Sequence, residues 1–163
     1  MPQPRTQVSF KIENTLKKML KYSVSTISSN VLADSVKCEL DWLILDSREL
    51  AEFEVSHLPN ARWVGYQDFS ICRVPDTPKD TKIVVYCSIG VRSEKIAEKL
   101  IAFGFSKVWN LYGGIFAWAN EHKTLVAHNQ NTTLAVHGYS QKWATLLEHH
   151  VQSKQSKQSK QSK

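Results

Sequence analysis

Short apolar runs alternate along the chain with segments in which apolar residues recur every three or four positions. The clearest runs lie in 42–45 and 82–86, and unbroken runs of this length are typical of strands buried on both faces. Weaker strands are predicted within 24–28, 57–64 and 107–111. The alternation predicts an α/β fold with a mostly parallel central sheet and helices on both faces. The helices are expected at 29–37, 49–56, 93–103 and 115–121.

Both ends of the chain carry segments that are expected to be extensions of this central region. Residues 10–22 place apolar side chains on one face of a helix and lysines on the other. We therefore expect 1–23 to be an N-terminal extension whose amphipathic helix docks on the domain. Residues 122–151 are expected to pack back on the domain as a C-terminal extension, through Val136, Tyr139, Trp143, Leu146 and Leu147.

The last twelve residues, 152–163, are four copies of the triplet Gln-Ser-Lys. Removing their four lysines lowers the formal net charge from +6 to +2, so the basic balance belongs largely to this tail. The repeat has no apolar residue to bury, so we predict that it is disordered. It also lacks interleaved aromatic residues, which makes nucleic acid an unlikely partner.

The sequence contains no segment that matches a membrane-spanning helix, a signal peptide or a transit peptide well. No apolar run approaches the roughly 18 residues that a membrane-spanning helix needs, so no membrane partner is expected. The N-terminal segment lacks the apolar core of a signal peptide. Glu13 and a single arginine there also argue against a transit peptide. These observations favour a cytoplasmic protein.

Three cysteines, Cys38, Cys72 and Cys87, are widely spaced and form no CxxC pair. This pattern argues against a disulfide framework and against a zinc site, so no metal and no other cofactor is expected. Reduced thiols are the simpler interpretation. Four scattered histidines are expected on the surface: His128, His137, His149 and His150.

Three chemically active side chains follow the two strongest predicted strands. Asp46 and Arg48 come at the end of the first strand, and Cys87 follows the second. Ligands of parallel α/β sheets bind outside the carboxyl ends of the strands. We therefore expect these three residues to lie at one edge of the sheet.

Cys87 opens a loop, 88–93, which joins a buried strand to the start of a helix. Successive amides in such a loop can turn inward and bind an anion, and Gly90 allows the tight bend. Arg92 adds a fixed positive charge and a forked hydrogen-bond donor. A thiol in this setting should ionise more readily than a free cysteine and act as a nucleophile.

Four segments together resemble the single-domain rhodaneses, a sulfurtransferase family that includes thiosulfate sulfurtransferases. The D-x-R motif of that family appears at 46–48, and its GG-x-x-x-W motif at 113–118. Its G-H-I-P-G-A motif appears at 56–61 with both glycines replaced. The resemblance covers 24–121 and implies a rhodanese-like domain there. The segments are "LDSRELAEFEVSHLPNA", "YCSIGVRS", "EKIAEKLIAFGF" and "VWNLYGGIFAWAN".

The resemblance implies that Cys87 attacks the outer sulfur of thiosulfate, releases sulfite and carries a persulfide. Arg92 would orient the oxygens of the donor. Asp46 and Arg48 are expected to support the loop, and Arg48 is also spaced to pair with Glu52 along a helix. The persulfide and the donor would be held by the backbone amides of Ser88, Ile89, Gly90, Val91, Arg92 and Ser93.

The implied partners are a thiosulfate-like sulfur donor and an acceptor that is cyanide, a cellular thiol or a protein. The double displacement implies ping-pong kinetics. Ser88 stands where some thiosulfate-preferring relatives have a basic residue and mercaptopyruvate-preferring relatives have glycine. Serine matches neither pattern, so the sequence leaves the donor open.

Three other functions fit parts of the same pattern. Phosphatases of the related fold separate the cysteine and arginine by five residues, whereas Cys87 and Arg92 are separated by four. The shorter loop favours sulfur over phosphate. A non-catalytic binding module is disfavoured because Cys87, Gly90 and Arg92 are all retained. Relay of persulfide sulfur to a protein or thiol within a pathway stays open.

Overall fold

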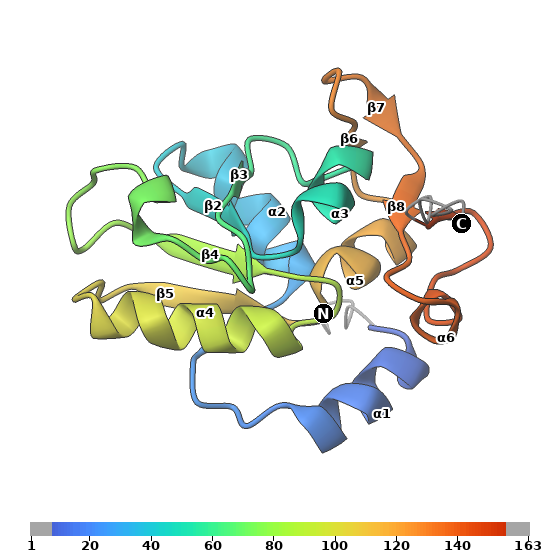
Figure 1. The fold of residues 1–163 in the computed structure, drawn as a ribbon, viewed down its shortest axis with the longest axis horizontal. Coiled ribbons are helices and arrows are strands. Elements are labelled where there is room, and N and C mark those ends of the chain that lie inside the picture. The colour runs from blue at the N-terminus through green and yellow to red at the C-terminus, as the bar shows by residue number, and fades with distance from the viewer. Residues whose placement is uncertain (1–7, 156–163) are drawn as a thin grey trace, which may run out of the picture.

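A five-stranded parallel sheet forms the centre of the protein in the computed structural model, which describes residues 8–155 (Figure 1). The strands lie in the order β1-β5-β4-β2-β3, and each neighbouring pair is parallel. The predicted α/β fold is therefore confirmed. The strands are β1 (Thr26–Ile27), β2 (Leu43–Asp46), β3 (Arg62–Trp63), β4 (Ile83–Tyr86) and β5 (Val108–Leu111).

Helices cover both faces of this sheet. Successive residues of a strand point to opposite faces, so neighbouring residues pack against different helices. Leu45 and Val85 belong to one apolar cluster, which they share with α4 (Val91–Ala102). Their neighbours Ile44 and Val84 belong to a larger cluster on the other side. That side is covered by α2 (Ser29–Cys38) and α5 (Gly114–Asn120) (Figure 1).

The register of β2 and β4 decides where the reactive side chains lie. Asp46 is paired with Tyr86, so both strands end side by side. Cys87 follows Tyr86 directly, Arg48 comes two residues after Asp46, and both leave the sheet at the same edge. This edge is formed by the carboxyl ends of the strands, where parallel α/β sheets bind their ligands.

Helix boundaries differ from the predicted ones by two residues or more in two places. α4 begins at Val91, two residues early, because Gly90 takes φ +124° and serves as its N-cap. α1 (Phe10–Met19) ends before the predicted residue 22, because Leu20 already has extended backbone. Ile101 of α4 is 46% exposed, whereas Ile96, Ala97 and Leu100 of the same helix are buried. Two short helices lie in connections, α3 (Leu50–Val55) and the 3-10 helix η1 (Ile71–Arg73).

Both extensions pack against the sheet domain. Ile12 and Leu16 of α1 are fully buried in the larger apolar cluster. Val136 is buried in the same cluster, and Trp143 packs against it. The C-terminal extension forms β6 (Leu125–Val126), β7 (Thr132–Thr133), β8 (Ala135–His137) and α6 (Gln141–Ala144).

The start of the Gln-Ser-Lys tail corrects the prediction that the tail is disordered from residue 152. Gln152–Lys154 forms β9, which pairs in parallel with β8. Backbone pairing needs no apolar side chain, and the preceding Val151 is buried in the core. The remainder of the tail, 156–163, lies outside the described residues.

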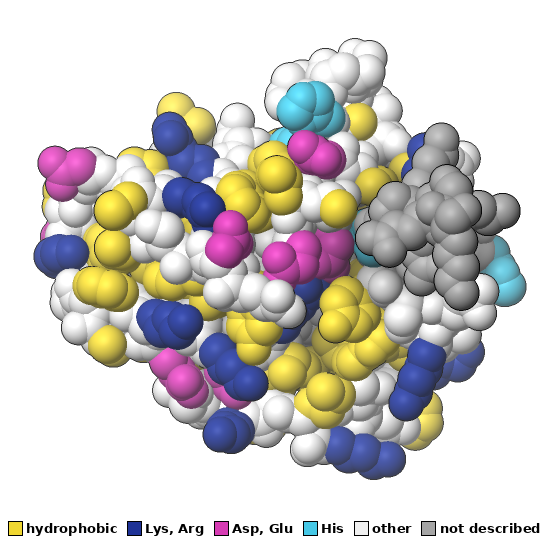
Figure 2. All heavy atoms as spheres, in the orientation of Figure 1, with side chains coloured by type: hydrophobic (Ala, Val, Ile, Leu, Met, Phe, Trp, Pro, Cys, Tyr) yellow, Lys and Arg dark blue, Asp and Glu magenta, His cyan; other side chains and the backbone are white. Residues whose placement is uncertain are grey.

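Charged side chains are scattered among polar and apolar ones on the face that Figure 2 shows. Apolar side chains gather on this face where the start of α4, α1 and the C-terminal extension meet (Figure 2). None of the helices within 8–155 is both long enough and apolar enough to span a membrane.

Candidate active site

The loop from Cys87 to Ser93 wraps around the sulfur of Cys87. The cysteine is 2% exposed, and the backbone N–H of Gly90 donates to its Sγ at 3.1 Å. Ser93 Oγ lies 3.4 Å from the same sulfur. A backbone amide aimed at sulfur stabilises a thiolate, so the geometry suits a cysteine that reacts as a nucleophile.

The first turn of α5 holds this loop in shape. The amides of Ile115 and Phe116 donate to the carbonyl oxygens of Cys87 and Ser88, both at 3.0 Å. The approach is so close that a Cβ on Gly114 would lie 2.4 Å from the Cys87 carbonyl oxygen. Gly114 also has φ +55°, so the double-glycine motif serves to let α5 reach the loop.

Asn110 supports the other side of the loop, and the sequence analysis did not single this residue out. It is fully buried at the end of β5, and its Nδ2 donates to the carbonyl oxygen of Gly90 at 2.9 Å. Ser93 Oγ donates to Asn110 Oδ1 at 2.6 Å. An amide side chain inside a buried strand was the available signal, because such a group needs partners for its donors and acceptor.

Arg92 is held by a carboxylate that sequence reasoning assigned elsewhere. Its Nη1 and Nη2 donate to the two carboxylate oxygens of Glu52 at 2.7 and 2.8 Å. Nη2 also donates to Ser88 Oγ at 2.9 Å. The expected pairing of Glu52 with Arg48 is wrong, because Arg48 precedes α3 and pairs with Asp46 instead.

Electrostatics keep both partners of the Arg92 pair charged. Burial disfavours the charge on Arg92, but hydrogen bonds to Glu52 and the attraction of Cys87 outweigh it and raise the Arg92 pKa. Burial likewise opposes ionisation of Glu52, yet its hydrogen bonds and attraction to Arg92 leave the Glu52 pKa lowered. The pair is therefore close to neutral as a unit.

Asp46 and Arg48 form a second pair, which lies behind the loop. Both side chains are fully buried, and Arg48 Nη2 donates to Asp46 Oδ2 at 2.7 Å. The same nitrogen donates to the carbonyl oxygen of Ser56, just past the end of α3, at 2.7 Å. Because α3 carries Glu52, this pair positions the partner of Arg92 and not the thiol itself.

His137 corrects the expectation that the scattered histidines are on the surface. It lies in β8 and is 5% exposed. Its Nδ1 accepts a hydrogen bond from the backbone N–H of Tyr139 at 2.9 Å. Burial, as the main cause, lowers the pKa of His137, so the ring is suited to this acceptor role at neutral pH.

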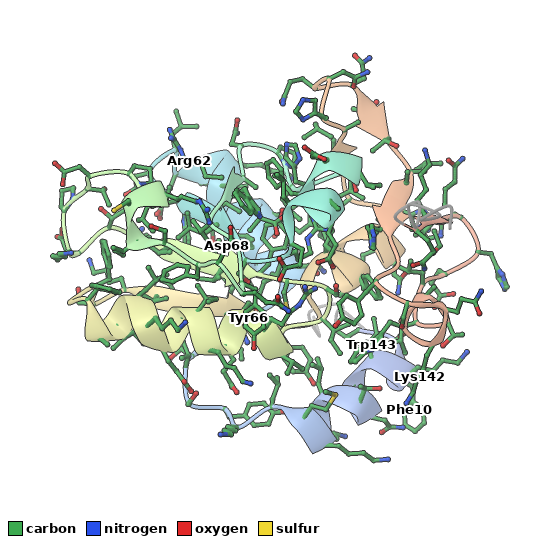
Figure 3. All side chains as sticks on the ribbon, in the orientation of Figure 1. Phe10, Arg62, Tyr66, Asp68, Lys142 and Trp143 are labelled. Carbon is green, nitrogen blue, oxygen red and sulfur yellow. The ribbon has the colours of Figure 1, made fainter. Side chains whose placement is uncertain are left out.

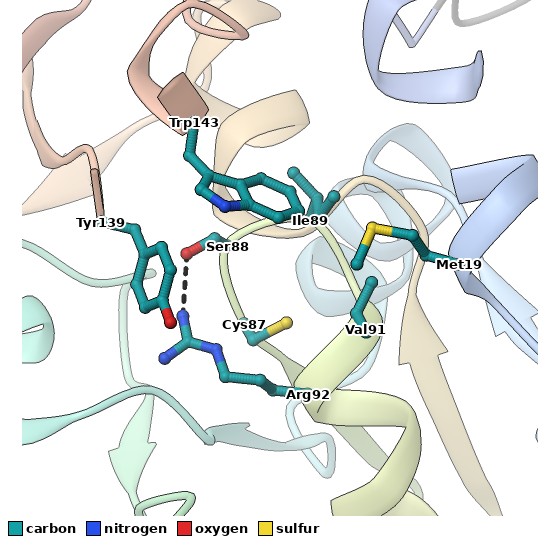
Figure 4. Close-up of a pocket in the computed structure, with 8 residues that line it drawn as sticks. All are labelled: Met19, Cys87, Ser88, Ile89, Val91, Arg92, Tyr139 and Trp143. Atoms are coloured by element: carbon teal, nitrogen blue, oxygen red, sulfur yellow. Dashed lines mark hydrogen bonds between the residues drawn. The ribbon is translucent and has the colours of Figure 1, made fainter. Parts of the chain in front are cut away.

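A pocket of about 150 Å³ opens above the thiol (Figure 4). Its walls include three residues from the two extensions, Met19, Tyr139 and Trp143, none of which the sequence placed at the site. The guanidinium of Arg92 lies 4.9 Å from the centre of the Tyr139 ring. The floor is formed by Cys87, Ser88, Ile89, Val91 and Arg92.

The remaining predicted site residues and the two other cysteines lie in different places. Gly90 and Ser93 do not line the pocket but contact the sulfur from within the loop. Cys38 and Cys72 are exposed free thiols, at the end of α2 and in η1, and neither lines the pocket. The structure thus brings one thiol to the site.

Comparison with known proteins identifies the family of this domain. A family model described as the rhodanese-like domain matches residues 31–121. The chain belongs to the rhodanese-like family. Its two extensions lie outside the matched region.

Individual relatives agree with the family. A sulfurtransferase of Allochromatium vinosum is 35% identical over 64% of this chain and 96% of its own length. A tRNA uridine(34) hydroxylase of Escherichia coli is 32% identical over 61% of this chain, but the chain spans only 31% of that protein. The solved rhodanese-like domain of an Anabaena protein superposes with TM-score 0.58 and 22% identity, covering 63% of this chain and 78% of that one.

Proposed function

We propose that the protein is a sulfurtransferase that carries sulfane sulfur as a persulfide on Cys87. Membership of the rhodanese-like family and the similarity to the Allochromatium sulfurtransferase support sulfur transfer as the general activity. The observation that carries the specific proposal is the Gly90 amide donating to Cys87 Sγ at the floor of an open pocket. The loop amide that stabilises a thiolate can also stabilise the outer sulfur of a persulfide.

The first half-reaction uses the Cys87 thiolate as the nucleophile. It attacks the outer sulfur of thiosulfate or a related donor, and a new S–S bond forms to Sγ. The bond between the outer sulfur and the sulfonate breaks, and its electron pair leaves with sulfite. The outer sulfur keeps its own negative charge as the persulfide, and the charge of the thiolate leaves with sulfite, so the step needs no oxidant or reductant.

Arg92 has two tasks in this proposal. Its contacts with Glu52 and Ser88 fix the loop, and its position on the pocket floor places a positive charge beside the incoming donor. A pre-positioned charge stabilises the transition state without rearrangement at the moment of reaction. Arg92 thus acts on the oxygens of the donor, while Asp46 and Arg48 act only through α3.

The second half-reaction returns the enzyme to its starting state. A nucleophilic acceptor attacks the outer sulfur, and the bond to Cys87 Sγ breaks with its electron pair retained on Sγ. Cyanide gives thiocyanate, and a thiol gives a new persulfide. Because the donor product leaves before the acceptor reacts, the two substrates never need to occupy the 150 Å³ pocket together.

The test is thiocyanate production from thiosulfate and cyanide by purified protein. We expect activity in the wild type, loss of at least about a thousandfold in Cys87→Ala, and little change in the matched thiol variant Cys72→Ser. Mercaptopyruvate replaces thiosulfate in a parallel series. Activity retained by Cys87→Ala, or a wild type inert with both donors and with inorganic polysulfide, contradicts the proposal and favours a binding module.

A further inference from the structure

The walls of the thiol pocket come from outside the region that defines the family. Met19 lies at the end of α1, and Tyr139 and Trp143 lie in the C-terminal extension. The family model ends at residue 121. The side chains that a substrate meets above Cys87 are thus specific to the extensions of this chain.

The two aromatic walls are held in place by dedicated contacts. Tyr139 has φ +65°, a strained conformation for a side-chain-bearing residue, and its amide is anchored on the buried His137. The amide of Gly138 donates to the carbonyl oxygen of Lys154, so β9 fastens this turn. Ser140 caps α6 and orients Trp143, whose ring meets Tyr139 edge-on at 6.2 Å. A wall built this way is preorganised for a ligand.

The chemistry of the pocket restricts what fits there. Met19, Ile89, Val91 and Trp143 present apolar surface, and Figure 4 shows them arranged around the opening above Cys87. Arg92 is the one cation among the lining residues, and both of its Nη atoms already bond Glu52. The lining therefore offers contact mainly to an apolar group, with a single, already paired cation for any anionic group.

The size of the opening excludes large occupants from this contact. Cys87 is 2% exposed at the bottom of a pocket of about 150 Å³. A small thiol can bring its sulfur to the loop while its substituent lies between Trp143 and Met19. The anionic sulfur would meet the loop, and the uncharged substituent would meet the apolar walls.

We propose that the sulfur acceptor is a low-molecular-weight thiol with an uncharged apolar substituent, selected by Trp143, Tyr139 and Met19. This inference rests on the proposed persulfide function. The thiolate RS⁻ attacks the outer sulfur of the protonated Cys87 persulfide, and an R–S–S bond forms. The bond from that sulfur to Cys87 Sγ breaks, which leaves R–S–SH and the Cys87 thiolate.

The test separates loading of Cys87 from discharge. Inorganic polysulfide loads the wild-type protein, and intact mass is expected to show one added sulfur that Cys87→Ala, treated in the same way, lacks. After polysulfide is removed, single-turnover discharge is followed with benzyl mercaptan, glutathione and cyanide at matched thiolate or anion concentrations. We expect benzyl mercaptan to exceed glutathione by at least about tenfold, because the apolar lining binds the ring and the two glutathione carboxylates meet one cation that Glu52 already pairs.

Variants of the wall provide the decisive comparison. Trp143→Ala is expected to lower the ratio of benzyl mercaptan to cyanide discharge about tenfold, and Trp143→Phe is expected to restore most of it. Lys142→Ala, the neighbouring exposed residue on α6, and Leu134→Ala, an exposed residue of the same extension, serve as controls (Figure 3). Both are expected to keep the wild-type ratio.

Each contrary result has a separate meaning. Discharge to glutathione as fast as to benzyl mercaptan, or an unchanged ratio in Trp143→Ala, overturns the inference and leaves the persulfide function intact. Faster discharge to reduced thioredoxin than to any small thiol overturns it in favour of a protein acceptor. Failure of polysulfide to load Cys87 overturns the proposed function and the inference together.

Discussion

Two arginine–carboxylate pairs involve α3: Glu52 of this helix pairs with Arg92, and Arg48 of the Asp46 pair contacts Ser56 just past the end of the helix. Asp46 and Arg48 are both fully buried, and Glu52 and Arg92 are 3% and 14% exposed. The shortest N–O distance is 2.7 Å in each pair. The first pair contacts only the interior, whereas Arg92 of the second pair also lines the thiol pocket.

This difference shows that the N–O distance alone does not reveal the role of an ion pair. A pair sealed from water holds the fold, because either partner left alone is an uncompensated buried charge. The pair at the pocket keeps its charge where a substrate arrives, and Tyr139 and Ser88 contact Arg92 there. We therefore expect mutations of the two pairs to separate stability from activity.

The largest expected effect is on stability, from Asp46→Ala. The change leaves the Arg48 guanidinium buried with the Ser56 carbonyl as its remaining strong acceptor, and we expect a loss of about 4 kcal/mol in the free energy of unfolding. Urea denaturation measures this loss. Glu13→Ala breaks the exposed pair with Lys17 and should cost less than about 0.5 kcal/mol. Equal losses in the two variants contradict the assignment.

Arg92→Ala should cost less stability than Asp46→Ala and should mainly lower the activity. We expect a loss of about 2 kcal/mol in stability, because Glu52 loses charged hydrogen bonds at a partly accessible site. The rate of persulfide formation from thiosulfate should fall about a hundredfold in protein that remains folded.

Arg73→Ala is the matched control for Arg92→Ala. Arg73 pairs with Asp68 and lies over Trp63, away from the thiol loop, so the rate of persulfide formation should be retained. An Arg92→Ala protein that unfolds like Asp46→Ala, or reacts like the wild type, would remove the distinction between the two pairs.

A smaller effect is expected from pH. The folded-state pKa of Glu52 lies below its ordinary value of 4.5, so its pairing contributes full stability above that pH. The contribution should disappear as the pH falls below 4.5 and through the lowered pKa. Unfolding of wild type and Glu52→Gln is compared between pH 7 and pH 3. The stability difference should shrink on acidification, and a constant difference would show that ionisation of Glu52 contributes nothing.

The smallest effect is expected from Ser88→Ala. Ser88 Oγ accepts from Arg92 and lies 3.3 Å from a Glu52 oxygen. Its loss removes these contacts, but the two direct hydrogen bonds between Arg92 and Glu52 remain. We expect a loss of about 1 kcal/mol in stability and a rate within about threefold of the wild type. A rate loss as large as that of Arg92→Ala would assign Ser88 a direct part in catalysis.

Much of the fold could be predicted from sequence, because its signals are local. The apolar runs at β2 and β4 predict buried strands, and parallel pairing then places Arg48 and Cys87 at one edge. The start of α4 was predicted two residues late, because its N-cap is a glycine with no side chain to signal it. Pairing of β9 with β8 was also missed, since it uses backbone groups alone.

The partners at the site were harder to predict, because they are distant along the chain. Glu52 and Arg92 are 40 residues apart, and helical spacing suggested a different partner for Glu52. Asn110 meets Ser93 across 17 residues, and its role depends on the turn of the loop. Trp143 and Tyr139 carried an apolar signal that predicted packing, but no pattern indicated that they would face the thiol.

The most direct measurement is the intact mass of the protein after brief exposure to thiosulfate. Wild type, Cys87→Ala and Cys72→Ser are compared side by side, each before and after cyanide. We predict that wild type and Cys72→Ser each gain one sulfur atom, which cyanide removes, and that Cys87→Ala gains none. A sulfur atom gained equally by Cys87→Ala would contradict the central claim that Cys87 carries the persulfide.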